Sequence, residues 1–157
     1  MVDPRVVPIP LTLKRADSPQ TLREALGEHR AKIPDFVEVD MARASEIDRL
    51  FAGHDVIHCL FGLGSSVGEE IRVDTYTLCA TTMSFRRYWA YITHPVVTKV
   101  LRETTTLASI PSILWSRCLV PWIWLRTRRA AKWDFDGWEE HLDTPLTTLR
   151  AQLRIRL

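Results

Sequence analysis

The chain has 157 residues, of which 46% are hydrophobic and 25% are charged, and its formal net charge is +2. This length is enough for one domain with a substantial core, and the composition is ordinary for a globular protein. The small net charge gives no strong case for nucleic acid as a partner, so we do not expect one. Three widely separated cysteines provide neither a disulfide framework nor a zinc ribbon.

Prolines at positions 4, 8 and 10 dominate the start of the chain. Proline removes a backbone N–H and disfavours helical backbone at the residue before it. We therefore expect residues 1–17 to form an extended or disordered arm, followed by a single domain over residues 18–157.

The first helix is predicted to begin at Ser18 or at Thr21 and to end near Arg30. Thr21 and Glu24 have the spacing of a capping box, which favours a helix start. Beyond this helix, valines alternate with acidic residues at positions 37–39, which would fit a brief strand, although the run is short.

A second helix is predicted from about Ser45. Its apolar side recurs at spacings of three and four residues, at positions 47, 50, 51, 54, 57, 58 and 61. This stripe includes His54 and His58, which lie one turn apart on one face of a helix, with Asp55 on the flank of that face. The two imidazoles are thus predicted to face the core.

A glycine turn and a third helix follow this histidine helix. Gly62 and Gly64 interrupt the helical pattern, and Ser66 with Glu69 has the spacing of a second capping box. Glu69 would be used at the helix start, which leaves Glu70 to turn inward. A helix, a turn and a second helix would therefore bring Glu70 back over the two histidines.

Four side chains, His54, Asp55, His58 and Glu70, are thus candidate ligands for one divalent ion and candidate catalytic residues. Nitrogen and carboxylate ligands suit zinc, iron or manganese, and open coordination positions are typical of a catalytic site. Such an ion can polarise a carboxylate or phenolic oxygen of a ligand. Asp74, one turn beyond Glu70, would orient a ligand or be a plain exposed acid. The alternative for the histidine pair is a hydrogen-bonded core pair.

The third helix is expected to run from Ser66 into the eighties and to end at Arg86 and Arg87, a favourable charge at a helix C-terminus. The two arginines are either solvated surface or a site that recognises an anion, and we favour the first interpretation. His94 and Pro95 mark a break, after which a new helix can begin.

Residues 107–125 are the most apolar part of the chain. Pro111, Pro121 and a central Arg117 argue against a helix that spans a bilayer. The segment would instead cover the core or lie at a membrane interface, and one helix can do both. The predicted membrane contact, with tryptophans followed by a basic cluster, comprises Trp122, Trp124, Arg126, Arg128 and Arg129.

The C-terminal residues predict a short docking helix that Thr144 caps and Pro145 begins. Strand signals are scarce throughout. We therefore predict an all-α fold, a single-domain helical bundle with a flexible N-terminal arm. Aromatic residues that precede the last helix are expected to anchor the core, and they are Trp133, Phe135 and Trp138.

The order His-Asp-x-x-His, eleven residues and Glu resembles the metal motif of the coenzyme Q (ubiquinone) biosynthesis family that acts on the ring carboxyl of polyprenyl benzoates. Here the motif is His54-Asp55-Val56-Ile57-His58 with Glu70. The tail is also similar to the family, in Trp138-Glu139-Glu140, Asp143-Thr144-Pro145-Leu146 and Leu149-Arg150-Ala151-Gln152-Leu153. The similarity runs from about residue 40 to the C-terminus.

The resemblance implies removal of the C1 carboxyl of a 4-hydroxy-3-methoxy-5-polyprenylbenzoate, with a hydroxyl entering at that carbon. It implies zinc as the ion, with magnesium, iron and manganese as alternatives. The implied partners are a prenylated benzoate or prenyl lipid, the membrane surface and other ubiquinone-synthesis enzymes, and a homodimer is left open. The protein would be peripheral, on the cytoplasmic face of a bacterial membrane or the matrix face of the mitochondrial inner membrane.

We lean towards an enzyme, a metal-dependent carboxy-lyase, and keep two alternatives. The first is a non-catalytic prenyl-lipid-binding scaffold that organises the ubiquinone-synthesis complex around a structural ion. The second is a metal-dependent phosphohydrolase, which usually needs further His and Asp ligands. The remaining histidines, His29, His94 and His141, show no comparable pattern, so the phosphohydrolase ranks third.

Overall fold

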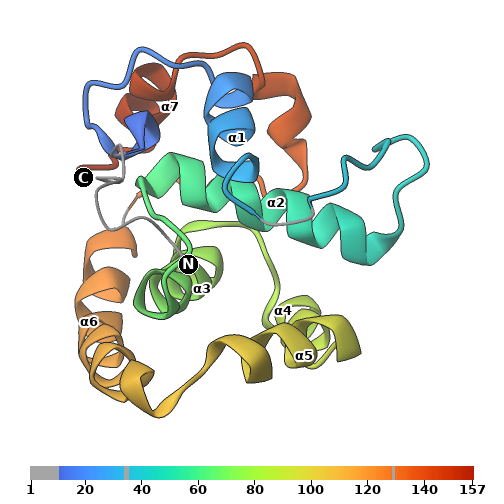
Figure 1. Cartoon of the computed structure of the whole chain (residues 1–157). Helices are drawn as coiled ribbons and strands as arrows, with labels where there is room; N and C mark the ends of the chain where they lie inside the picture. Colours follow the sequence, from blue (N-terminus) through green and yellow to red (C-terminus); the bar gives the residue numbers. More distant parts are fainter. Residues whose placement is uncertain (1–10, 34–35, 129) are drawn as a thin grey trace, which may run out of the picture.

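Helix α2 (Glu46–Phe61) crosses the middle of the molecule, with α1 and α7 on one side and α3 and α6 on the other (Figure 1). The computed structural model describes residues 11–33, 36–128 and 130–157. The other helices are α1 (Leu22–Arg30), α3 (Val67–Ala80), α4 (Phe85–Ile92), α5 (Pro95–Thr104), α6 (Ile110–Thr127) and α7 (Leu146–Gln152). Short 3-10 helices are η1 (Thr12–Lys14), η2 (Leu107–Ser109) and η3 (Gly137–His141).

Capping side chains start the first helices where the sequence predicts them. The backbone N–H of Thr21 donates to Glu24 Oε2 at 2.8 Å, and the backbone N–H of Ser45 donates to Asp48 Oδ2 at 3.0 Å. These bonds satisfy backbone donors that the first turn of a helix leaves unpaired. The predicted starts of α1 and α2 are therefore confirmed.

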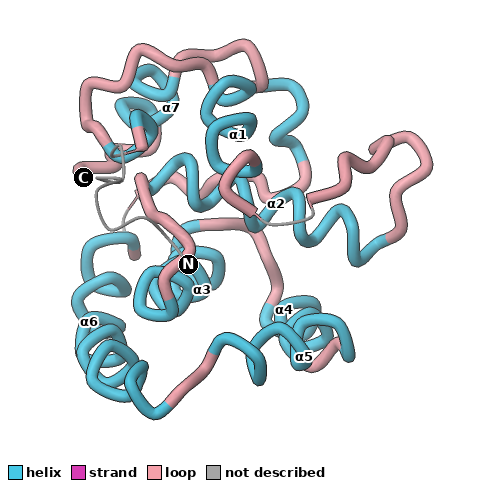
Figure 2. Tube along the Cα trace, in the orientation of Figure 1, coloured by secondary structure: helices cyan, strands magenta, loops and turns pink. Residues whose placement is uncertain are grey.

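The described residues form helices joined by loops, and they contain no strand (Figure 2). The predicted all-α fold is confirmed, and the brief strand considered at residues 37–39 is absent. The expected arm differs over residues 11–17, where η1 forms and Leu13 is fully buried. Glu28 holds η1 in place, because its carboxylate accepts the backbone N–H groups of Thr12 and Leu13 at 2.8 and 3.0 Å. Residues 1–10 lie outside the described residues.

Helix α3 ends earlier than the sequence predicts. It stops at Ala80, and Arg86 and Arg87 lie in the first turn of α4 instead. The reason is a contact distant in the sequence: Trp133 donates its N–H to Ala80 O at 2.8 Å, and Thr82 donates its N–H to Trp133 O at 2.9 Å. This exchange holds the chain in an extended conformation where the helix would have continued.

Arg150 joins the C-terminal helix to the end of α2. Its side chain is 3% exposed, and its guanidinium donates to four backbone carbonyls, those of Leu13, Arg15, Cys59 and Leu60, at 2.5–2.9 Å. Two of these carbonyls, those of Cys59 and Leu60, belong to the last turn of α2, where carbonyls lack the i+4 donor of the helix interior. The tail thus fixes the position of the histidine helix. The predicted core anchors Trp133, Phe135 and Trp138 are buried.

Helix α6 is apolar but mostly exposed. Its buried residues, Ser116, Ile123 and Thr127, form one narrow stripe, and α6 packs against α3. Ser116 donates its hydroxyl to Gly68 O at 2.9 Å across that contact. The sequence predicts that residues 107–125 cover the core or lie at a membrane interface, and only this stripe fits the first interpretation. None of the helices among the described residues combines the length and apolar character needed to cross a bilayer.

Candidate metal centre

Helix α2 presents two imidazoles on its inner face. His58 is 2% exposed and His54 has a side chain that is 12% exposed. Their ring centroids lie 4.9 Å apart, in an edge-to-face arrangement. The four-residue spacing therefore places the two rings together on a buried face, as the apolar stripe predicts.

The glycine turn returns the chain to this face. Gly62 ends α2 with a φ of 61°, a left-handed conformation that glycine adopts without strain. Ser66 then begins α3, and its hydroxyl donates to Glu69 Oε2 at 2.7 Å. Lys14 also donates to Glu69, at 2.6 Å. Because Glu69 is bound at the helix start, Glu70 is the acid that faces α2.

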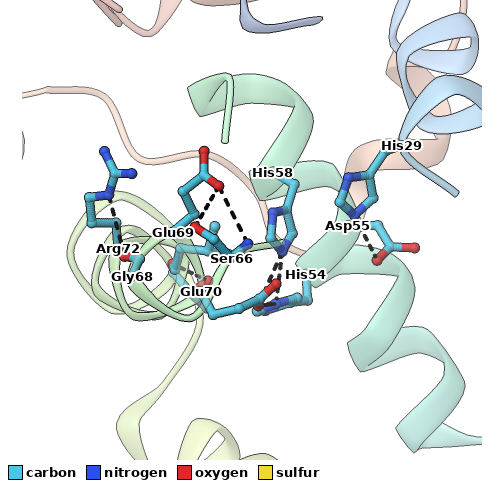
Figure 3. A network of polar contacts seen from close by, with 11 residues as sticks. His29, His54, Asp55, His58, Ser66, Gly68, Glu69, Glu70 and Arg72 are labelled. Atoms are coloured by element: carbon cyan, nitrogen blue, oxygen red, sulfur yellow. Dashed lines mark hydrogen bonds and ion pairs between the residues drawn. The ribbon is translucent and has the colours of Figure 1, made fainter. Parts of the chain in front are cut away.

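Three ligand atoms from α2 and α3 converge at one point (Figure 3). His54 Nε2 lies 3.1 Å from Glu70 Oε2, His58 Nε2 lies 3.4 Å from the same oxygen, and the two Nε2 atoms are 3.2 Å apart. The predicted approach of Glu70 to both histidines is therefore confirmed.

The charges in this cluster favour one another. Burial alone would raise the pKa of Glu70, but hydrogen bonds from His54 and His58 hold that pKa well below its usual range. Burial opposes the charged form of His54, yet the carboxylate of Glu70 outweighs it and raises the pKa of His54. Glu70 is thus an anion with two imidazole nitrogens beside it.

The donor set fits a divalent cation. In a tetrahedral zinc site with ligand bonds of about 2.0–2.1 Å, adjacent ligand atoms are about 3.3 Å apart. The three separations here are 3.1, 3.2 and 3.4 Å. Two imidazoles and one carboxylate also leave positions for a ligand, as in catalytic rather than closed structural sites. The structure therefore contains a candidate metal-binding triad of His54, His58 and Glu70.

Asp55, the fourth predicted ligand, lies apart from this triad. It points away from Glu70, toward the end of α1 (Figure 3). Its Oδ2 accepts the Nε–H of Arg30 at 3.0 Å, and its Oδ1 lies 3.8 Å from His29 Nε2. Successive helix residues are turned by about 100°, so Asp55 cannot share the inner face with both histidines unless the helix unwinds.

His29 is the neighbour that the sequence analysis missed. It is 2% exposed, and its ring stacks on His58 with centroids 4.5 Å apart. Burial, followed by the proximity of His58, lowers the pKa of His29 to about 4, so this imidazole is neutral at pH 7. The capping box at Thr21 predicts the helix that contains His29, but only the packing of α1 on α2 brings the His29 ring to the site.

Asp74 and two tyrosines lie beside the triad. Burial, followed by the charge of Asp74, raises the pKa of Tyr88, and the ring of Tyr91 lies 5.7 Å from that of His54. Burial first, and then the charge of Glu70, raises the pKa of Asp74. Asp74 is therefore a partly buried acid with a phenol partner rather than a plain exposed one. Both tyrosines are buried on α4, where no motif marks them.

The predicted membrane residues lie on the exposed part of α6. Trp122 and Trp124 are each about half exposed, and the guanidinium groups of Arg126 and Arg128 lie over their rings at 4.9 and 5.4 Å. Arg129 lies outside the described residues. Of the two other candidates for anion recognition, Arg86 is exposed, and Arg87 is instead paired with acidic residues of α2 and of the loop before η3.

An all-α domain with a partly buried two-histidine, one-carboxylate cluster defines the class of this protein as a candidate metal-binding helical protein. Residues 36–157 match the family described as coenzyme Q (ubiquinone) biosynthesis protein Coq4. The chain belongs to this family, as the resemblance implies. Comparisons with curated proteins and with solved structures give no match.

Proposed function

We propose that this protein acts in ubiquinone biosynthesis by removing the C1 carboxyl of a polyprenylated 4-hydroxy-3-methoxybenzoate as carbon dioxide. A hydroxyl enters at that carbon, and because this exchange is a two-electron oxidation, we include dioxygen as the co-substrate that supplies the oxygen atom and accepts the electrons. Family membership supports the pathway. The observation that carries the proposal is the convergence of His54, His58 and Glu70, in the order of the family's metal motif.

In this proposal the triad holds one divalent ion, with zinc as the first choice and magnesium, iron or manganese as alternatives. When bound, such an ion supplies Lewis-acid polarisation of a carboxylate or phenolic oxygen. His58 is buried, the side chain of His54 is 12% exposed, and both are held on one helix face, so they would keep a fixed position as a ligand arrives. Among the three protein ligands, Glu70 would be the one that carries negative charge.

The neighbouring acid and phenols offer groups for the substrate. Asp74, whose pKa is raised, is suited to hold a proton, and the phenol of Tyr88 lies within range of its charge. Tyr91 lies next to His54 and is buried, so its ring would exclude water from one side of the site. The carboxylate and the 4-hydroxyl of the substrate ring are the polar groups that these side chains would meet.

Turnover by purified protein tests the proposal. The protein, prepared without a metal-affinity tag, is incubated in air-saturated buffer with a prenylated 4-hydroxy-3-methoxybenzoate, and the ring product and carbon dioxide are followed by mass spectrometry. We expect loss of the carboxyl with the wild type and none with His58→Ala, while His94→Ala, outside the triad, serves as the matched control. Substrate binding without loss of carbon dioxide in the wild type would contradict an enzymatic role.

That outcome would favour the second candidate, a non-catalytic prenyl-lipid-binding scaffold for the other ubiquinone-synthesis enzymes. The exposed apolar side chains of α6 support it, because a helix with this surface is suited to contact lipid or protein. In that case the ion would be structural, and its removal would lower stability without changing any chemistry.

We also propose that the protein works at a membrane surface, on the cytoplasmic face in a bacterium or the matrix face in a mitochondrion. Tryptophans with stacked arginines at the end of α6 favour an interface with anionic headgroups. Sedimentation with anionic and with neutral vesicles tests this. We expect Trp122→Ser/Trp124→Ser to lose anionic-vesicle binding, whereas Phe85→Ser, an exposed aromatic on α4, retains it. Equal binding by both variants would exclude this surface.

A further inference from the structure

The last turn of α1 packs behind the histidine helix, although α1 lies before the family-matched residues 36–157. Two of its side chains reach α2 at the level of the triad. His29 stacks on His58, and Arg30 pairs with Asp55. A segment outside the matched region thus contacts one ligand directly and a neighbour of both histidines.

Both oxygens of Asp55 face α1. The Arg30 Nε–H bonds one at 3.0 Å, and His29 Nε2 lies 3.8 Å from the other. Both members of the ion pair are largely buried, with side chains 11% and 19% exposed. A buried charge pair separates only at considerable cost, because each partner would be left uncompensated. Asp55 is therefore held in this direction and not toward Glu70.

The ring of His58 depends on its stacking partner. Its Nδ1 is buried and has no hydrogen-bond partner among the described residues, so no bond on that side fixes the ring plane. In metal sites the second ring nitrogen is usually hydrogen-bonded, and that bond sets the orientation of the ligand. Here the face of His29, 4.5 Å away and inclined by 25°, is the contact that can do so.

We propose that His29 and Arg30 are positioning residues for the metal centre, and that Asp55 anchors α2 to α1 rather than serving as a ligand. Arg30 and Asp55 fix the rotation of α2, and His29 fixes the plane of His58, so that both Nε2 atoms meet Glu70. This inference rests on the proposed metal centre, but it does not depend on which reaction the centre performs.

Metal affinity separates an anchor from a ligand. Zinc affinity is measured by competition with a chromophoric chelator for the wild type, Arg30→Gln, Asp55→Asn and the double variant. For an anchoring pair, each single variant weakens binding by about 10- to 100-fold, the range for groups that orient a ligand. The double variant should then be no weaker than either single variant, because both remove the same interaction. Arg30→Lys, which keeps the charge, should restore most of the affinity.

The stacking role has its own pair of variants. His29→Phe keeps an aromatic face of similar size and should bind zinc like the wild type, whereas His29→Ala removes the face and should bind more weakly. Cobalt absorption spectra add a readout that general destabilisation would not change. If Asp55 is an anchor, the cobalt absorption bands of Asp55→Asn should have the same shape as those of the wild type, because the three metal ligands are the same.

Several results would overturn the inference. Asp55 would be a ligand if Asp55→Asn changed the cobalt spectrum while Arg30→Gln bound zinc as tightly as the wild type or more tightly. Equal zinc affinity in His29→Ala and His29→Phe would exclude the stacking role. A wild type that binds neither metal would exclude the positioning proposal altogether, whereas metal binding without turnover would contradict only the proposed reaction.

Discussion

Helices α2 and α6 are similar in length and both rich in apolar residues, yet they differ in how much of each is buried. Ten of the 16 residues of α2 are buried, whereas three of the 18 residues of α6 are. Neighbours explain the difference, because α1, α3, η1 and α7 all pack on α2, and α6 packs chiefly on α3. Burial of its side chains stabilises an apolar helix, but its composition does not tell whether the surface that buries it belongs to the same chain.

The comparison predicts that α2 is sensitive to substitution and α6 is not. Arg150→Met should have the largest effect, because it removes the hydrogen bonds that the guanidinium donates to four backbone carbonyls, two of them at the end of α2. We expect a loss of about 3 kcal/mol or more in the free energy of unfolding, since each unsatisfied buried group costs about 1–3 kcal/mol. Urea unfolding measures it. Arg86→Met, on the exposed side of α4, should change stability by less than about 0.5 kcal/mol.

Removal of metal should have the second-largest effect on stability. A ligand that binds only the folded state at 100 times its dissociation constant adds about 2.7 kcal/mol of stability. For a chain of this size we expect the thermal midpoint to fall by about 5–10 °C when a chelator removes zinc. His94→Ala should respond like the wild type and His58→Ala should not respond. A chelator effect of equal size in His58→Ala would place the metal elsewhere.

The glycine before His54 offers a third test. A Cβ on Gly53 would lie 2.6 Å from the ring of Phe135, a contact that neither helix nor ring can relieve without moving. Gly53→Ala should therefore cost about 1–3 kcal/mol, as overpacking does. Gly27→Ala, in α1, is the matched control, because nothing lies within 4 Å of its Cβ and the change favours the helix by up to about 1 kcal/mol. Equal effects of the two variants, measured in urea, would contradict this packing.

The carboxylate that holds η1 should give a pH-dependent effect. Burial would raise the pKa of Glu28, but hydrogen bonds from Thr12 and Leu13 outweigh it and lower that pKa from its ordinary 4.5. A lowered pKa stabilises the folded state above pH 4.5, and this contribution is lost as the pH falls through the folded-state pKa. Glu28→Gln should thus cost about 1 kcal/mol at pH 7 and progressively less below pH 4.5. A cost that is constant from pH 7 to pH 3 would contradict this.

The smallest effect should come from α6. Trp115 is 68% exposed, so Trp115→Ser should change the free energy of unfolding by less than about 0.5 kcal/mol. Trp138→Ser, at a position 6% exposed, should cost at least about 3 kcal/mol. A large loss with Trp115→Ser would mean that α6 is covered in solution, and the contrast with α2 would disappear.

The sequence by itself determined the features that short-range physics controls. Capping pairs at Thr21, Ser45 and Ser66 set the helix starts, and helical spacing placed His54 and His58 on one face. A glycine turn between two capped helices was enough to bring Glu70 to them. These signals lie within a few residues of the structure that they specify, so a single chain can reveal them.

Only the tertiary structure decided the rest, because those features depend on partners far along the chain. Asp55 bonds Arg30 on α1, which is 25 residues away in the sequence. Helix α3 ends at Ala80 because Trp133 forms backbone hydrogen bonds with Ala80 and Thr82. Burial of α2 and exposure of α6 follow from which helices pack beside each one. A side chain's type and spacing show which contacts it can make, and the packed fold selects among them.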